Sequence, residues 1–174
     1  MIPGLEPWAQ EALGAGVGLA IGALVGLERG FKLRKQKPGT RVAGVRTFTL
    51  IGLTGGLAGL VGHRQPVAAA IILVGLIAPL AIAYAPRLMK QGDATSPIAA
   101  AATIAAAFLA GLGSIGLALA AGAIIVFVLA LKDSIHDFVD RLSEKDIRAL
   151  ARYGIIALAV LPFLPDQAMG PYGA

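Results

Sequence analysis

The sequence contains no cysteine and little charge. Of its 174 residues, 14% are charged and 6% are aromatic, whereas soluble domains carry about 25% charged residues. The absence of cysteine excludes disulfide frameworks and thiolate metal sites. Scarce charge, 57% hydrophobic residues and a mean hydropathy of +0.79 together predict a protein that lies in a membrane.

Binding to nucleic acid is not expected, although the formal net charge is +5. The basic residues lie beside apolar runs, and few aromatic residues are interleaved with them. Positive charge next to apolar segments sets the topology of membrane proteins. We therefore expect membrane lipid, and no nucleic acid, as the surroundings of the chain.

Six apolar stretches predict the transmembrane helices. They cover residues 12–28, 47–62, 66–85, 97–112, 115–131 and 153–164. A bilayer core needs about 20 helical residues, so several stretches must gain length from their flanks or lie in a locally thin bilayer. The expected fold is all-α: a polytopic helical membrane protein with five to six spans.

Lysine and arginine predict the orientation. The first, third and fifth connections between these stretches hold seven, two and five basic residues, whereas the second holds only Arg64 and the fourth holds none. Basic connections remain in the cytoplasm. We therefore expect the first connecting loop in the cytoplasm and the N-terminus outside, as in a multi-pass protein of a bacterial inner membrane.

Glycine recurs at every fourth position in the first two spans. These positions, which are candidates for helix packing, are Gly14, Gly18, Gly22, Gly26, Gly52 and Gly56. Small residues four apart let a second backbone approach closely in lipid. Two interpretations stay open, packing within the chain and the seam of a homodimer, and we expect a homo-oligomer.

The fifth span is expected to continue into the cytoplasm. Residues 135–142 keep helical spacing of apolar side chains, and Ser143 with Asp146 forms a capping-box pattern that opens a new helix. This pattern predicts a cytoplasmic helical hairpin extension that lies on or near the inner membrane surface.

Glu28 ends the first apolar stretch and faces Arg46 and Thr47 at the start of the second. Charges at membrane depth are expensive and mark function or pairing. One interpretation is a structural ion pair with Arg29 or Arg46. The other is a cation or anionic-ligand site, with Glu28 as acceptor and with donors from Arg46 and Thr47, near a helix N-terminus.

Two further motifs could carry chemistry. Asp133, His136 and Asp137 share a helical face and are candidate ligands for a divalent cation such as magnesium, although a solvated polar face accounts for them better. "GLGSIG" (111–116) lacks the strand of a dinucleotide site. No serine, histidine and acid are arranged for nucleophilic catalysis, so we expect no enzyme.

"GLERGFK" (26–32) followed by "AGVRTFTLIGLTGGLAGL" (43–60) resembles the MgtC/SapB family, in which similar segments end the first helix and open the second. The departures are Val45 for the usual leucine and a longer basic insert from Lys32 to Arg41. The matching positions are Glu28, Arg29, Gly44, Arg46 and Thr47.

The resemblance implies that residues 1–86 form an MgtC/SapB-like transmembrane segment. Residues 87–174 then form a further transmembrane helical region, like the start of the hydrophobic domain of longer bacterial relatives. It also implies a bacterial inner-membrane protein in divalent-cation (magnesium) homeostasis that acts as a transporter or a transport modulator. The alternative is a non-transporting regulatory subunit whose glycine-rich helix faces bind a partner membrane protein.

Overall fold

The structure is a computed structural model that describes residues 6–32, 34, 43–91, 94–131, 138 and 140–160. The described residues are helical or lie in turns and connections, and no strand occurs among them, which confirms the all-α fold. The chain divides into two compact units, Met1–Ala130 and Leu131–Ala174, which are described separately below.

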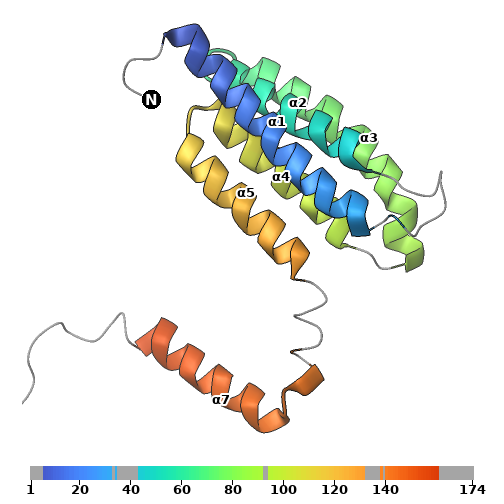
Figure 1. The fold of residues 1–174 in the computed structure, drawn as a ribbon, viewed down its shortest axis with the longest axis vertical. Coiled ribbons are helices and arrows are strands. Elements are labelled where there is room, and N and C mark those ends of the chain that lie inside the picture. Colours follow the sequence, from blue (N-terminus) through green and yellow to red (C-terminus); the bar gives the residue numbers. More distant parts are fainter. Residues whose placement is uncertain are drawn as a thin grey trace, which may run out of the picture. The chain divides into compact units, whose positions relative to one another are not determined.

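The first unit is a bundle of five helices that run alternately in opposite directions (Figure 1). The helices are α1 (Pro7–Lys32), α2 (Val45–Gly62), α3 (Pro66–Gln91), α4 (Thr95–Gly111) and α5 (Ile115–Ala130). Two tight turns, at residues 63–65 and 112–114, join α2 to α3 and α4 to α5. The second turn needs the left-handed backbone of Gly113, with φ at 86°, which glycine adopts without strain.

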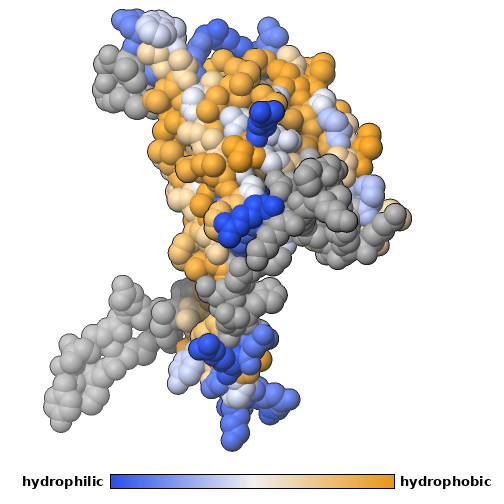
Figure 2. Space-filling model, turned by 45° about the vertical axis from the view of Figure 1, so that its right-hand side comes forward, coloured by the Kyte–Doolittle hydropathy of each residue, from blue (hydrophilic) through white to orange (hydrophobic). Residues whose placement is uncertain are grey.

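The bundle has the dimensions and surface of a membrane domain. Helices α1, α2 and α3 are long and apolar enough to cross a bilayer, whereas α4 and α5 are apolar but have only 17 and 16 residues. The visible side of the bundle is mostly apolar in Figure 2, with hydrophilic residues gathered near its ends. Because α4 and α5 are short, crossing the membrane requires flanking residues or a thinner bilayer around them.

Helix α2 is the centre of the bundle and packs against α1, α3 and α4. Its contact with α1 is made through glycine. A Cβ atom at Gly22 would lie 2.2 Å from the carbonyl oxygen of Phe48, and one at Gly52 would lie 2.2 Å from that of Gly18. The two backbones therefore touch directly, as small residues allow in lipid.

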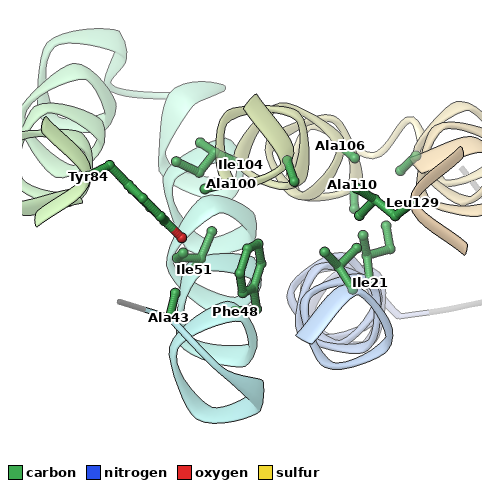
Figure 3. Packing of buried hydrophobic residues seen from close by; sticks show 13 residues of the cluster. Ile21, Ala43, Phe48, Ile51, Tyr84, Ala100, Ile104, Ala106, Ala110 and Leu129 are labelled. Carbon is green, nitrogen blue, oxygen red and sulfur yellow. The ribbon is translucent and has the colours of Figure 1, made fainter. Parts of the chain in front are cut away.

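The remaining core is built from small and branched side chains between α1, α2, α4 and α5. Figure 3 shows Phe48 and Ile51 on α2, Ile21 on α1, and Ala100, Ala106 and Ala110 on α4. Helix α3 lies at the edge, and Tyr84, only 5% exposed, points from it toward α2. The outer face of α3 has no partner among the described residues, which suits contact with lipid.

The second unit contains α7 (Glu144–Ile155) and the π-helical turn η2 (Ile156–Val160). The predicted capping box is confirmed: the Ser143 hydroxyl accepts a hydrogen bond from the backbone N–H of Asp146, whose carboxylate accepts one from the N–H of Ser143. Nearly all of α7 is exposed, and none of its residues is buried. The predicted sixth span, residues 153–164, begins in α7 and η2 and otherwise lies outside the described residues.

Candidate functional site

The last turns of α1 direct three charged side chains toward two other helices. Glu28 and Lys32 are four residues apart, so they share one face of α1, and that face meets the end of α5. Arg29 lies on the neighbouring face and meets the start of α4. The end of α1 is therefore joined to two helices that lie far away in the sequence. We call Glu28, Arg29, Lys32, Ser96 and the Leu129 carbonyl the α1-end cluster.

Lys32 connects the Glu28 carboxylate to the backbone of α5. Its ammonium lies 3.3 Å from Oε1 of Glu28, and it donates a hydrogen bond to the carbonyl oxygen of Leu129. The last carbonyl groups of a helix have no partner within that helix, and a lysine that bonds to one also interacts favourably with the helix dipole. Lys32 thus holds α5 at its C-terminal end.

Arg29 makes the second connection. Arg29 is only 5% exposed, and its guanidinium donates a hydrogen bond to the hydroxyl oxygen of Ser96, which is itself buried. Arginine keeps its charge under all physiological conditions. The start of α4 therefore holds a permanent positive charge inside the protein.

The carboxylate of Glu28 is buried, but it lacks the hydrogen bonds that a buried carboxylate normally accepts. Its side chain is 10% exposed, and within the described part of the chain neither carboxylate oxygen accepts a hydrogen bond. The Nε atom of Arg29 likewise has no hydrogen-bond partner there. Buried polar atoms without partners are rare in native proteins, and each such atom calls for an explanation.

The pairing of Glu28 differs from the sequence-based expectation. Arg46 is exposed and makes no ion pair with the described residues, and Thr47 is half-buried at the start of α2. Arg29 is turned toward Ser96. Among the described residues, Glu28 forms its ion pair with Lys32, which belongs to the same helix, so this pair does not tie α1 to α2 as an Arg46 pair would. The spacing of Glu28 and Lys32 was visible in the sequence, whereas Ser96 and the Leu129 carbonyl had no local signal.

The other candidate residues fall in two groups. Asp133, His136 and Asp137 lie outside the described residues, and no group of three or more metal-ligating side chains occurs among those that are described. The six packing glycines all contact backbone or side-chain atoms of another helix in the first unit. Gly14 faces Ala110 of α4, Gly26 faces Val45 of α2, and Gly56 faces Ala15 of α1.

A pocket of about 610 Å³ opens at the opposite end of the bundle, between the start of α1 and the two tight turns. Glu11 forms an ion pair with Arg64 at 3.2 Å, and the Nε2–H of His63 donates to the carbonyl oxygen of Leu112 at 2.7 Å. All these side chains are at least partly exposed to solvent. This end therefore carries compensated charge, whereas the α1-end cluster carries a buried carboxylate without a hydrogen bond.

A model of one protein family, described as the MgtC family, matches residues 16–138. The match covers more than half of the chain and includes α1 from residue 16 onward and the whole of α2 to α5. It extends well beyond the motifs at 26–32 and 43–60 that carry the resemblance. It also passes residue 86, where the first of two transmembrane regions is expected to end, and that division stays a prediction. No curated protein and no solved structure gives a significant match.

Proposed function

The chain belongs to the MgtC family, and on that premise we propose that it acts in divalent-cation (magnesium) homeostasis by modulating other membrane proteins. It would do so in the bacterial inner membrane without conducting ions itself. The packing of the bundle interior favours a modulator over a transporter.

A route for ions needs polar groups inside the spans, because a hydrated cation loses water when it enters the membrane core. In the described part of the bundle, the residues buried as a whole that carry polar side chains are Arg29, Ser96 and Thr103, and the carboxylate oxygens of Glu28 are buried as well. The first two lie together at one end. The hydroxyl of Thr103 donates to the carbonyl oxygen of Ala99 in its own helix, 2.7 Å away, and a single hydroxyl oxygen cannot replace the hydration shell of an ion.

Backbone-to-backbone contact leaves no room for a channel between α1 and α2 or between α2 and α4. A Cβ atom at Gly59 of α2 would lie 2.1 Å from the carbonyl oxygen of Phe108 on α4. Such contacts make the bundle a solid support. They also occupy the glycine faces, so a partner membrane protein has to bind to the outer helix surfaces.

The orientation is part of the proposal. The α1-end cluster lies where α1 ends, α4 begins and α5 ends. The first and fifth connections leave the bundle at this end, and the third connection enters α4 there. The excess of lysine and arginine in those connections supports a cytoplasmic location for this end. A modulator with its buried charges at this end would respond to conditions in the cytoplasm.

The test compares growth with flux. A strain that lacks the gene should grow poorly under magnesium limitation and should recover with the wild-type chain, while the purified chain in liposomes should give no Mg²⁺ flux above protein-free vesicles. A known Mg²⁺ channel in the same lipid provides the positive control. Flux that depends on the chain would overturn the modulator proposal in favour of transport, and failure to restore growth would contradict the role in magnesium homeostasis.

A further inference from the structure

We propose that the Glu28 carboxylate and the Leu129 carbonyl oxygen form a divalent-cation site that the Lys32 ammonium occupies in the structure. A divalent cation and Lys32 then compete for the same two oxygens. This inference rests on the proposed role in divalent-cation homeostasis and adds to it the place where the chain detects the cation.

The ligands have the right chemistry. Magnesium binds hard oxygen atoms, usually one or two carboxylates completed by several retained waters. Here an ammonium ion already lies between a carboxylate oxygen of α1 and a backbone carbonyl oxygen of α5. The side chain of Lys32 is 23% exposed, so water reaches the position of its ammonium group and could complete the coordination shell.

An independent observation also points to a ligand. Both carboxylate oxygens of Glu28 are buried, and among the described residues neither accepts a hydrogen bond. The Lys32 ammonium lies 3.3 Å from Oε1, and no described residue donates a hydrogen bond to Oε2. A buried acceptor without a donor costs free energy. A cation bound to the carboxylate removes this cost more completely than the ammonium does.

The charges nearby make the site respond to concentration. Glu28 contributes one negative charge, whereas Lys32 and Arg29 contribute two positive charges. Mg²⁺ cannot join both of these cations around one carboxylate without strong repulsion. It therefore binds only when Lys32 leaves, which keeps the affinity weak. Departure of Lys32 also releases the C-terminal end of α5 from α1.

The experiment removes the competing ammonium. Lys32→Met keeps the aliphatic stem and both oxygens, and it leaves the buried carboxylate without a counter-charge, so the full chain in detergent should melt at a lower temperature. Added MgCl₂ should restore the melting temperature of this variant, because a ligand that binds only the folded state stabilises it. Its Mg²⁺ affinity should exceed that of the wild type about tenfold or more, because one opposing charge is gone.

The controls separate binding from screening. NaCl at matched ionic strength should not restore Lys32→Met, and the double variant Glu28→Gln/Lys32→Met should melt independently of MgCl₂. Glu11→Gln removes a carboxylate that is paired at the other end of the bundle and should leave the Mg²⁺ response unchanged. A response of Lys32→Met to NaCl that equals its response to MgCl₂, or a response that survives in the double variant, would overturn the site.

A second measurement does not depend on the folding of Lys32→Met. Titration with Mn²⁺, detected by electron paramagnetic resonance, should find one site in the wild-type chain that Glu28→Gln lacks; equal binding by both would refute the proposal. Glu28→Gln leaves Lys32 free to bond to Leu129, so the fold should persist. If the chain restores growth but the wild type and Glu28→Gln bind Mn²⁺ equally, only the cation site is refuted. If the chain binds Mn²⁺ at this site but does not restore growth, the proposed function is refuted instead.

Discussion

Arg29 and Ser96 form a buried polar contact between α1 and α4. Because the arginine cannot lose its charge, removing the Ser96 hydroxyl leaves a buried guanidinium with one donor fewer satisfied. Ser96→Ala should therefore lower the free energy of unfolding by about 1.5–3 kcal/mol, the usual range for hydrogen bonds to charged groups. Chemical unfolding monitored by circular dichroism would measure the loss.

Two variants complete this test. Ser114→Ala removes an exposed hydroxyl at the other end of the bundle and should change the free energy of unfolding by less than about 0.5 kcal/mol. Arg29→Met/Ser96→Ala should be more stable than the sum of its single changes, since the uncompensated charge is gone. Equal losses for Ser96→Ala and Ser114→Ala would show that the contact contributes nothing to stability.

Arg46 gives the opposite expectation. It is exposed and has no ion pair with the described residues, so Arg46→Gln should change the free energy of unfolding by less than about 0.5 kcal/mol. Melting curves of this variant should superimpose on those of the wild type. A loss as large as that of Ser96→Ala would mean that Arg46 has a buried role, and the account of the α1-end cluster would then be incomplete.

At this scale the sequence predicted where unusual charge lies but not every partner. Glu28 and Arg29 were recognisable because they interrupt an apolar segment. Lys32 could have been identified as the partner of Glu28 from its spacing on the helix. Ser96 and the Leu129 carbonyl were not predictable, since α4 and α5 reach α1 only through the tertiary fold and a backbone carbonyl has no signature in the sequence.

At the scale of the element, the contact between α1 and α2 depends on the absence of side chains. Gly22→Ala places a Cβ atom 2.2 Å from the Phe48 carbonyl oxygen, and should lower the free energy of unfolding by about 1–3 kcal/mol through overpacking. Gly16 is a matched control in the same helix, because a Cβ atom there meets nothing within 4 Å.

Gly16→Ala should be neutral or should stabilise the chain by up to about 1 kcal/mol, since alanine favours the helix more than glycine does. Thermal unfolding of both variants in the same detergent measures the difference. If Gly22→Ala is as stable as Gly16→Ala, the two helices can separate without cost, and the close packing that supports the modulator proposal loses its basis.

The start of α7 should be sensitive to acid. Hydrogen bonds from the Ser143 hydroxyl and then from the Ser143 N–H hold the pKa of Asp146 below its ordinary value of 3.8. A lowered pKa in the folded state means that the cap stabilises α7 above about pH 3.8 and loses this effect as the pH falls through the lowered value. Amide hydrogen exchange in the first turn should accelerate over that interval.

Ser143→Ala supplies the check on this assignment. Without the hydroxyl, the pKa of Asp146 should move upward toward 3.8, because the largest cause of its depression is gone. Titration of the Asp146 carboxyl carbon by NMR would follow the change. An unchanged pKa would assign the depression to another group and would separate the cap from the acid response.

The elements themselves were largely predictable, and their ends were not. Each of the first five apolar stretches overlaps one helix of the structure. Helix α1 nevertheless runs from Pro7 to Lys32, beyond the apolar residues 12–28, and α3 continues to Gln91. Hydropathy marks the part of a helix that contacts lipid, whereas a helix ends where backbone hydrogen bonding stops, so the two boundaries need not coincide.

At the scale of the whole molecule, the two ends of the bundle differ in charge as well as in structure. The end with the α1-end cluster is joined to connections that hold fourteen of the fifteen basic residues, and the other end holds only Arg64. Since basic connections stay in the cytoplasm, this asymmetry predicts one orientation, with the pocket near Glu11 on the outside. The absence of cysteine makes the prediction easy to test.

Single cysteines at Gln36 and Gln91 should be labelled by a membrane-impermeant maleimide only in inside-out vesicles, and a cysteine at Gln65 should be labelled in intact cells. Gln65 is exposed in the turn between α2 and α3, and its replacement leaves the ion pair of Glu11 with Arg64 in place. Restored growth by each variant shows that the labelled chains are functional. Labelling of position 36 in intact cells would reverse the orientation and would place the proposed cation site outside the cytoplasm. Mg²⁺ at the α1-end cluster would then report on the external medium, and the modulator would have to act from that side.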